Sequence, residues 1–131
     1  MSAPVAEWWL HQEGDLTIAA SALRQRLRAA GWSAPEVARP VTVFMELGRN
    51  ILKYARAGRM QVWELAGRGI ALEAADRGPG IADPDAAMRD HFSTGGTLGL
   101  GLPGVRRLCD SFELETAPGA GTRVRVTLWA R

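Results

Sequence analysis

Cysteine, lysine and histidine are scarce in this 131-residue chain, and each scarcity excludes a class of structure or chemistry. The single cysteine, Cys109, has no partner for an intramolecular disulfide, so a packed core must hold the fold together. The two histidines, His11 and His91, are isolated from each other and from the cysteine, so they form no cluster with metal-ligand spacing. The one lysine, Lys53, follows a leucine, and the chain therefore lacks a Gly-Lys-Ser/Thr phosphate loop.

Long apolar runs and clustered positive charge are also missing. No apolar stretch approaches the roughly 20 residues that cross a membrane, and residues 1–10 lack the basic start of a signal peptide. The formal net charge is only +2, and the arginines are scattered, whereas nucleic-acid binding needs a concentrated basic face. These absences predict a cytoplasmic protein with neither a membrane nor a nucleic-acid partner.

The composition, 47% hydrophobic and 23% charged, is typical of a soluble globular protein, and the length fits one domain over residues 1–131. Hydrophobic periodicity predicts a first helix that Asp15 or Thr17 caps, with Ile18, Ala22, Leu23 and Leu27 as its apolar stripe. It further predicts helices over residues 33–57 and 102–109, and strands over residues 5–10, 60–66, 69–75, 112–116 and 122–129. The pattern indicates an α/β (α+β) two-layer sandwich, with helices on one face of a mixed, largely antiparallel sheet.

The second helix carries a pair of polar residues, Glu46 and Asn50, whose four-residue spacing places them on one side. One interpretation is a solvated polar face opposite the core. However, Val43, Leu47 and Tyr54 lie near the same side, so the pair is expected within a covered surface. A carboxylate beside an amide oxygen is also a plausible site for Mg²⁺, which prefers hard oxygen ligands.

Directly after a predicted strand comes the run Asp76-Arg77-Gly78-Pro79-Gly80. Asp, Gly and Pro are common in turns, and a plain turn is one interpretation. The functional interpretation is that Gly78 and Gly80 let the backbone approach a flat ligand. The Asp76 carboxylate would then accept a hydrogen bond from an amino group such as that of adenine.

A glycine-rich run over residues 95–104 leads into the third helix, and leucines alternate with its glycines. Exposed backbone N–H groups before a helix N-terminus favour an anion, which predicts phosphate binding. Residues 99–104 also match the dinucleotide fingerprint G-x-G-x-x-G. That fingerprint must follow an apolar strand, and residues 90–98 are polar, so the match fails in context.

In this order, the motifs resemble the GHKL ATP-binding family of sensor histidine kinases, gyrase-type enzymes and heat-shock chaperones. Glu46-x-x-x-Asn50 resembles its N box, Asp76-x-Gly78-x-Gly80 its first glycine box, residues 99–102 its second, and residues 119–122 its late Gly-Thr element. A closer resemblance is to the small serine/threonine switch kinases (RsbT-like) of bacterial stress-signalling modules. It is carried by residues 46–51, 54–55, 76–83, 92–94, 98–104 and 107–110.

The resemblance implies ATP and Mg²⁺ as cofactors. Glu46 would be the catalytic residue that orients or deprotonates a serine or threonine hydroxyl, and Asn50 would help to hold Mg²⁺ against the phosphates. The residues implied to bind the nucleotide are Asn50, Asp76, Gly78, Gly80, Ile81, Thr94, Gly99, Leu100, Gly101, Leu102 and Thr122.

The resemblance also implies that the γ-phosphate is transferred to a STAS-domain antagonist protein. Two alternatives stay open. One is an anti-sigma factor that sequesters a sigma subunit, and the other is a nucleotide-gated binding module that activates a phosphatase. The sequence also leaves open whether the protein forms a homodimer.

Overall fold

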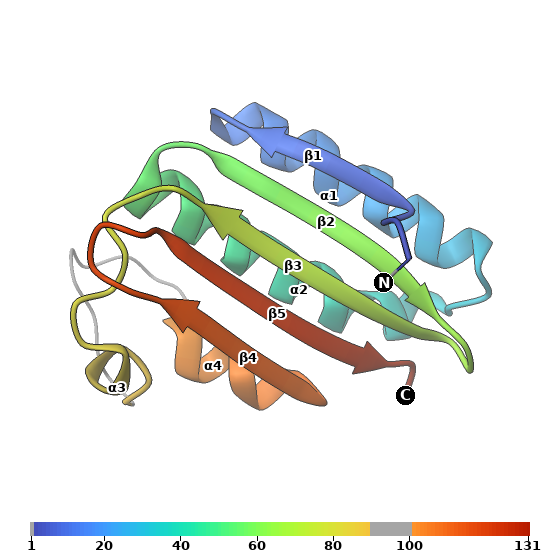
Figure 1. Cartoon of the computed structure of the whole chain (residues 1–131). Helices are drawn as coiled ribbons and strands as arrows, with labels where there is room; N and C mark the ends of the chain where they lie inside the picture. The colour runs from blue at the N-terminus through green and yellow to red at the C-terminus, as the bar shows by residue number, and fades with distance from the viewer. Residues whose placement is uncertain (1, 90–100) are drawn as a thin grey trace.

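A five-stranded antiparallel sheet with helices on one face makes up the protein (Figure 1). The computed structural model describes residues 2–89 and 101–131. In chain order the elements are β1 (Ala6–Leu10), α1 (Glu13–Ala29), α2 (Ala34–Asn50), the π-helical segment η1 (Ile51–Ala55), β2 (Gly58–Leu65), β3 (Gly69–Asp76), α3 (Pro84–Ala87), α4 (Gly101–Leu108), β4 (Ser111–Thr116) and β5 (Thr122–Trp129).

The strands are ordered β1-β2-β3-β5-β4, and every neighbouring pair is antiparallel. The two-layer fold class is therefore confirmed, but the predicted mixed sheet is not. The connection from β3 to β4 contains helices α3 and α4, which suggests a parallel crossover, and β4 does run in the same direction as β3. However, β5 lies between these two strands, so β3 and β4 do not pair with each other.

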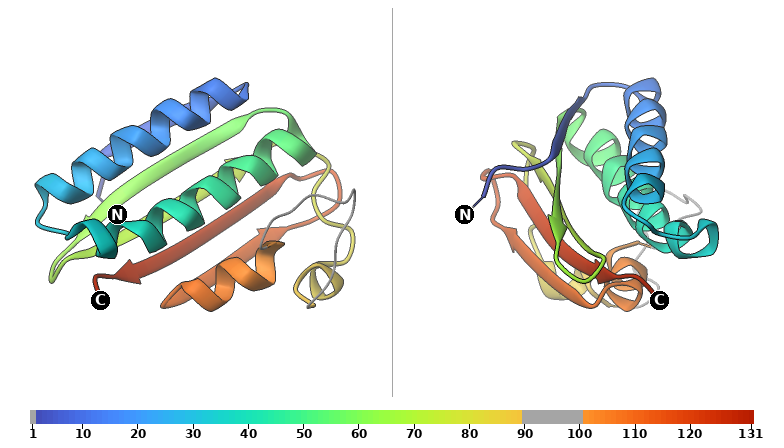
Figure 2. Two further views of the ribbon diagram at one scale, coloured as in Figure 1. Left: turned by 180° about the vertical axis from the view of Figure 1, so that it is seen from behind. Right: turned by 90° about the vertical axis from the view of Figure 1, so that its right-hand side faces the viewer.

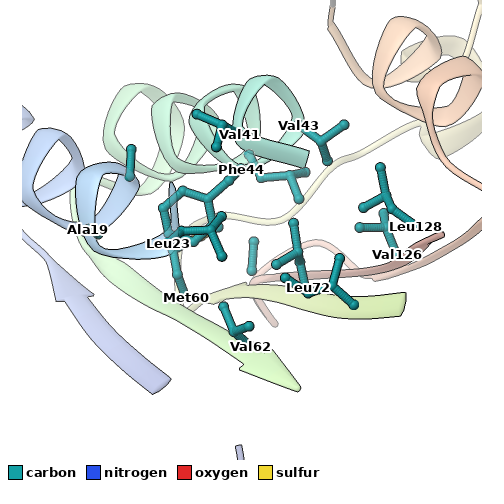
Figure 3. Close-up of a cluster of buried hydrophobic side chains, with 14 of the residues drawn as sticks. Ala19, Leu23, Val41, Val43, Phe44, Met60, Val62, Leu72, Val126 and Leu128 are labelled. Atoms are coloured by element: carbon teal, nitrogen blue, oxygen red, sulfur yellow. The ribbon is translucent and has the colours of Figure 1, made fainter. Parts of the chain in front are cut away.

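Helices α1, α2 and α4 cover the same face of the sheet, as Figure 2 shows from behind and from the side. The core lies between the layers, where Leu23 and Phe44 from the helices meet Met60, Val62 and Leu72 from the strands (Figure 3). Because side chains alternate along a strand, the inward residues of β2, β3 and β5 form a continuous apolar surface under the helices. In this packing β3 lies against α2 and η1.

Helix α1 begins earlier than predicted. Asp15 is inside its first turn, where its carboxylate accepts hydrogen bonds from the backbone N–H groups of His11 (2.9 Å) and Gln12 (3.1 Å). The predicted stripe was correct for Leu23 and Leu27 but wrong for Ile18, which is 69% exposed. The buried side begins at Leu16, and two residues further on the helix has turned by about 200°.

The second helix starts as predicted but ends differently. Ser33 caps α2, and its side chain and that of Glu36 form a reciprocal capping box. The predicted continuation to residue 57 was wrong, because α2 ends at Asn50 and η1 follows over Ile51–Ala55. Arg56, with φ 71°, then ends the helical conformation. Single π-helical turns often occur at functional sites, and Ile51, Tyr54 and Ala55 of this one line the pocket described below.

The tryptophan pair of β1 divides between the two faces of the sheet. Trp8 packs edge-on against Phe44, with ring centroids 5.5 Å apart, whereas Trp9 is 59% exposed.

Among the described residues, no helix has the length and apolar character needed to span a membrane.

Candidate functional site

A pocket of about 270 Å³ opens where β3 ends, β5 begins and η1 passes over the sheet. This is the end of the sheet at which α3 and the start of α4 also lie (Figure 1). The lining residues come from segments that are distant in the sequence: Leu47, Asn50, Ile51, Tyr54, Ala55, Ala74, Asp76, Pro79, Gly80, Ile81, Ala87, Gly101, Leu102, Thr122 and Val124. Most are apolar, so the pocket suits a flat ring that a few polar groups orient.

The pocket brings together seven of the residues predicted to bind the nucleotide, namely Asn50, Asp76, Gly80, Ile81, Gly101, Leu102 and Thr122. Gly78 and the predicted catalytic residue Glu46 are outside its lining. Thr94, Gly99 and Leu100 lie outside the described residues.

Asp76, the last residue of β3, is held by two backbone groups. Its Oδ1 accepts hydrogen bonds from the N–H of Gly78 (2.8 Å) and of Thr122 (3.3 Å). No group within residues 2–89 and 101–131 donates to its Oδ2. The carboxylate is thus fixed in orientation and keeps one oxygen available to a donor on a ligand.

The glycines after Asp76 permit close approach of protein segments to one another. A Cβ on Gly78 would lie 2.6 Å from the Cβ of Ala55 in η1. Gly80 has φ +75°, and a Cβ there would lie 2.0 Å from the carbonyl oxygen of Ala117 in the β4–β5 turn. The Gly119 N–H donates to the Pro79 carbonyl at 2.7 Å, which ties the same two segments together. Direct approach of these glycines to a ligand stays a prediction.

Thr116, at the end of β4, was not among the predicted site residues. Its Oγ1 accepts a hydrogen bond from the Ile81 N–H (2.9 Å), donates to the Gly121 carbonyl (3.0 Å) and lies 2.9 Å from the Thr122 Oγ1. The only signal in the sequence was that a threonine flanks each side of the turn between the last two strands, a pattern with no special meaning until the register is known.

Asn50 and Glu46 differ in their surroundings although both are on α2. Asn50 lines the pocket, whereas the Glu46 carboxylate accepts from the Arg49 Nη1 at 3.4 Å, and its side chain is 13% exposed. The Arg49 Nε also lies 3.7 Å from a Glu13 carboxylate oxygen on α1. The predicted placement of the pair within a covered surface is confirmed for Val43 and Leu47, which are buried, but was wrong for Tyr54, which is 51% exposed.

The residues present would suit a magnesium ion that arrives with phosphate groups. In the part of the chain that the structure describes, no three His, Cys, Asp or Glu side chains gather into a metal site. Asn50 lines the pocket, and its amide oxygen would offer one hard ligand. Mg²⁺ commonly takes one or two protein oxygens, with phosphate oxygens and waters completing its shell.

The late glycine-threonine element and the start of α4 complete the site. A Cβ on Gly121, which has φ +78°, would lie 2.1 Å from the Asp76 carbonyl oxygen. Because glycine has no Cβ, β5 can begin directly beside the end of β3.

Residues 36–131 match a family model described as histidine kinase-, DNA gyrase B- and HSP90-like ATPase. The chain belongs to this ATPase family. The resemblance inferred from its motifs is thereby confirmed.

Individual relatives of this ATPase-family chain agree with that assignment. It is 40% identical over 122 residues to the serine/threonine-protein kinase RsbT of Bacillus subtilis (strain 168), a match that covers 91% of this chain and 92% of RsbT. It is 36% identical over 66 residues to an anti-sigma F factor of Thermoanaerobacter sp. (strain X514), which covers 48% of this chain and 46% of that protein.

Among solved structures, a chain in the SiaB–SiaC complex of Pseudomonas aeruginosa superposes with a TM-score of 0.67 at 13% identity. The superposition covers 96% of this chain and 90% of that one. At so low an identity this likeness is evidence of the shared fold alone.

Proposed function

We propose that this ATPase-family protein is a serine/threonine-protein kinase of a bacterial partner-switching module, and that ATP binds in the pocket between η1, the end of β3 and the start of β5. The observation that carries the proposal is the convergence of Asn50, Asp76 and Thr122 on one pocket from three separate segments. The 40% identity to a serine/threonine-protein kinase over nearly its full length supports the same function.

In the proposed complex the adenine ring occupies the apolar part of the pocket. Ile51 and Val124 offer surfaces for the flat ring, and the Asp76 Oδ2 accepts a hydrogen bond from the adenine amino group. The phosphates extend toward Asn50 and toward the start of α4, where Gly101 and Leu102 contribute backbone N–H groups. Thr94, Gly99 and Leu100 are further phosphate-contacting residues in this proposal.

Magnesium neutralises phosphate charge when it is bound. Asn50 would supply one oxygen to it and would thereby help to hold the phosphates near the end of α2. Glu46 lies one helical turn before Asn50, on the same side of the helix. Its carboxylate orients the hydroxyl of the protein substrate and accepts the proton.

The transfer itself forms a bond between the substrate hydroxyl oxygen and the γ-phosphorus, and breaks the bond from that phosphorus to the bridging oxygen. The electron pair of the broken bond leaves with ADP. Phosphoryl transfer depends mainly on positioning and on neutralising charge, so these few groups are sufficient.

We further propose that the protein substrate is a STAS-domain antagonist. The test is transfer of label from γ-labelled Mg-ATP to a STAS-domain protein that co-purifies with this chain, using the wild type and Asn50→Ala. We expect label on a serine or threonine of the STAS protein with the wild type only. Tight ATP binding without transfer would contradict the kinase assignment and favour a nucleotide-gated binding module or sequestration of a sigma subunit.

A further inference from the structure

The side chain of Thr116 determines how the Thr122 hydroxyl faces the pocket. These two residues are directly opposite each other in the β4–β5 register, and their hydroxyl oxygens are 2.9 Å apart. Thr122 lines the pocket, whereas Thr116 is not among the lining residues. Any influence of Thr116 on a ligand must therefore pass through its neighbours.

A hydroxyl group has one proton to donate and two lone pairs to accept with. The Gly121 carbonyl can only accept, so its 3.0 Å contact uses the proton of Thr116. The Ile81 N–H can only donate, so its 2.9 Å contact uses one lone pair. The contact with Thr122 must then use the second lone pair of Thr116, which makes Thr122 the donor.

This assignment commits the Thr122 proton to Thr116, and the Thr122 oxygen is left as an acceptor toward the pocket. The neighbouring Asp76 carboxylate also presents only an acceptor there, because its Oδ1 is occupied by two N–H groups and no described residue donates to its Oδ2. This part of the wall therefore favours a purine edge with an amino group over one with a carbonyl group.

We propose that Thr116 is a positioning residue that gives the site its selectivity for 6-amino purine nucleotides over 6-oxo purine nucleotides. The inference rests on the proposed function, because it assumes that the pocket holds the purine ring. Without the Thr116 hydroxyl, the Thr122 proton is free to turn into the pocket. It can then donate to the carbonyl oxygen of a 6-oxo purine.

The test compares dissociation constants for ATP and ITP, which differ only at this edge of the ring, by calorimetric titration of the whole protein. The wild type should bind ATP more tightly than ITP. Thr116→Val should lower the ratio of the ITP to the ATP dissociation constant by about three- to tenfold, the effect of one hydrogen bond. Thr116→Ser restores the hydroxyl and should restore the ratio.

A merely structural role for Thr116 would weaken ATP and ITP binding equally, and an unchanged ratio in a folded Thr116→Val protein overturns the inference. Thr122→Val is a second variant that leaves the Thr116 bonds to Ile81 and Gly121 in place. It should lower the same ratio, and adding Thr116→Val to it should change the ratio no further. A full wild-type ratio in Thr122→Val also overturns the inference. Failure of the wild type to bind ATP at all would instead overturn the proposed function.

Discussion

Gly80 is the position where a single methyl group should do the most damage to the pocket. Its φ is +75°, and a Cβ would lie 2.0 Å from the Ala117 carbonyl oxygen, a backbone atom that no side-chain rotation can remove. A left-handed conformation costs an alanine about 1–2 kcal/mol. To relieve the contact, residues 79–81 must move away from the β4–β5 turn by more than about 1 Å, because a carbon and an oxygen need at least ~3.2 Å.

That movement breaks the 2.7 Å hydrogen bond from the Gly119 N–H to the Pro79 carbonyl, which contributes about 1 kcal/mol. Together the two effects predict that Gly80→Ala lowers the free energy of unfolding by about 2–3 kcal/mol, or the melting temperature by roughly 10 °C. ATP affinity should fall as well, because Gly80 lines the pocket.

Gly119→Ala is the matched control. Gly119 has φ +77°, almost the same backbone strain, but nothing lies within 4 Å of its Cβ position. It should lose about 1–2 kcal/mol, from strain alone, and keep its ATP affinity. The assay is thermal and urea unfolding of both variants, followed by nucleotide titration. Equal destabilisation of the two variants would refute the argument that contact with Ala117 makes Gly80 necessary.

Glu46→Gln should keep ATP affinity within about threefold, because Glu46 is not expected to contact the nucleotide. It should reduce phosphate transfer by about 10²- to 10⁴-fold in a single-turnover assay, since the proton acceptor is lost. Normal transfer in this variant would exclude Glu46 as the proton acceptor. Asn50→Ala should lose the gain in ATP affinity that Mg²⁺ gives the wild type, measured by titration with and without the metal; an undiminished gain would place the magnesium ligand elsewhere. Burial raises the pKa of the Cys109 thiol to about 12, whereas an unfolded thiol ionises near pH ~8.5. Between these pH values the unfolded chain loses a proton that the native chain keeps, so the free energy of unfolding should fall as the pH rises. The fall should be steeper in the wild type than in Cys109→Ala, as measured by urea unfolding at pH values from about 7 to 11. Parallel curves for the two proteins would contradict this.

The layers of the fold and much of the pocket were predictable because they depend on local patterns. Alternating apolar residues mark β2, β3 and β5, and Asp76 stands at a strand end beside a Gly-Pro-Gly turn. The spacing of Asn50 on α2 likewise places it on a defined side of the helix. Each of these inferences needs only a few neighbouring residues.

Other features depend on contacts between distant segments and left no local signal. The π-helical turn at Ile51–Ala55 continues the apolar pattern of α2, so nothing in its sequence separates it from an ordinary helix. The position of β5 between β3 and β4 depends on which strands pair in the sheet, and the pattern of apolar residues along each strand does not determine that order. Thr116 gains its importance only because the register places it beside Thr122 and because the loop after β3 returns to it.

The ion pair of Glu46 with Arg49 was also not predicted, although the two residues are three positions apart on one helix. The predictions for Glu46 were its spacing from Asn50 and its catalytic role, and neither involved Arg49. The structure places Asn50 at the pocket and Glu46 outside the lining, so the assignment of Glu46 as the catalytic residue stays a prediction.

The most direct test of the central claim, that ATP binds in this pocket through Asp76, is titration of Mg-ATP into the wild type and into Asp76→Asn. An asparagine keeps an acceptor for the Gly78 and Thr122 N–H groups but presents its amide NH₂ where the Asp76 Oδ2 now faces the pocket. The account predicts a loss of ATP affinity of at least about tenfold with little change in melting temperature. Glu64→Gln, which changes an exposed carboxylate paired with Arg26, is the control and should bind ATP normally. Unaltered ATP affinity in a folded Asp76→Asn protein would contradict the account.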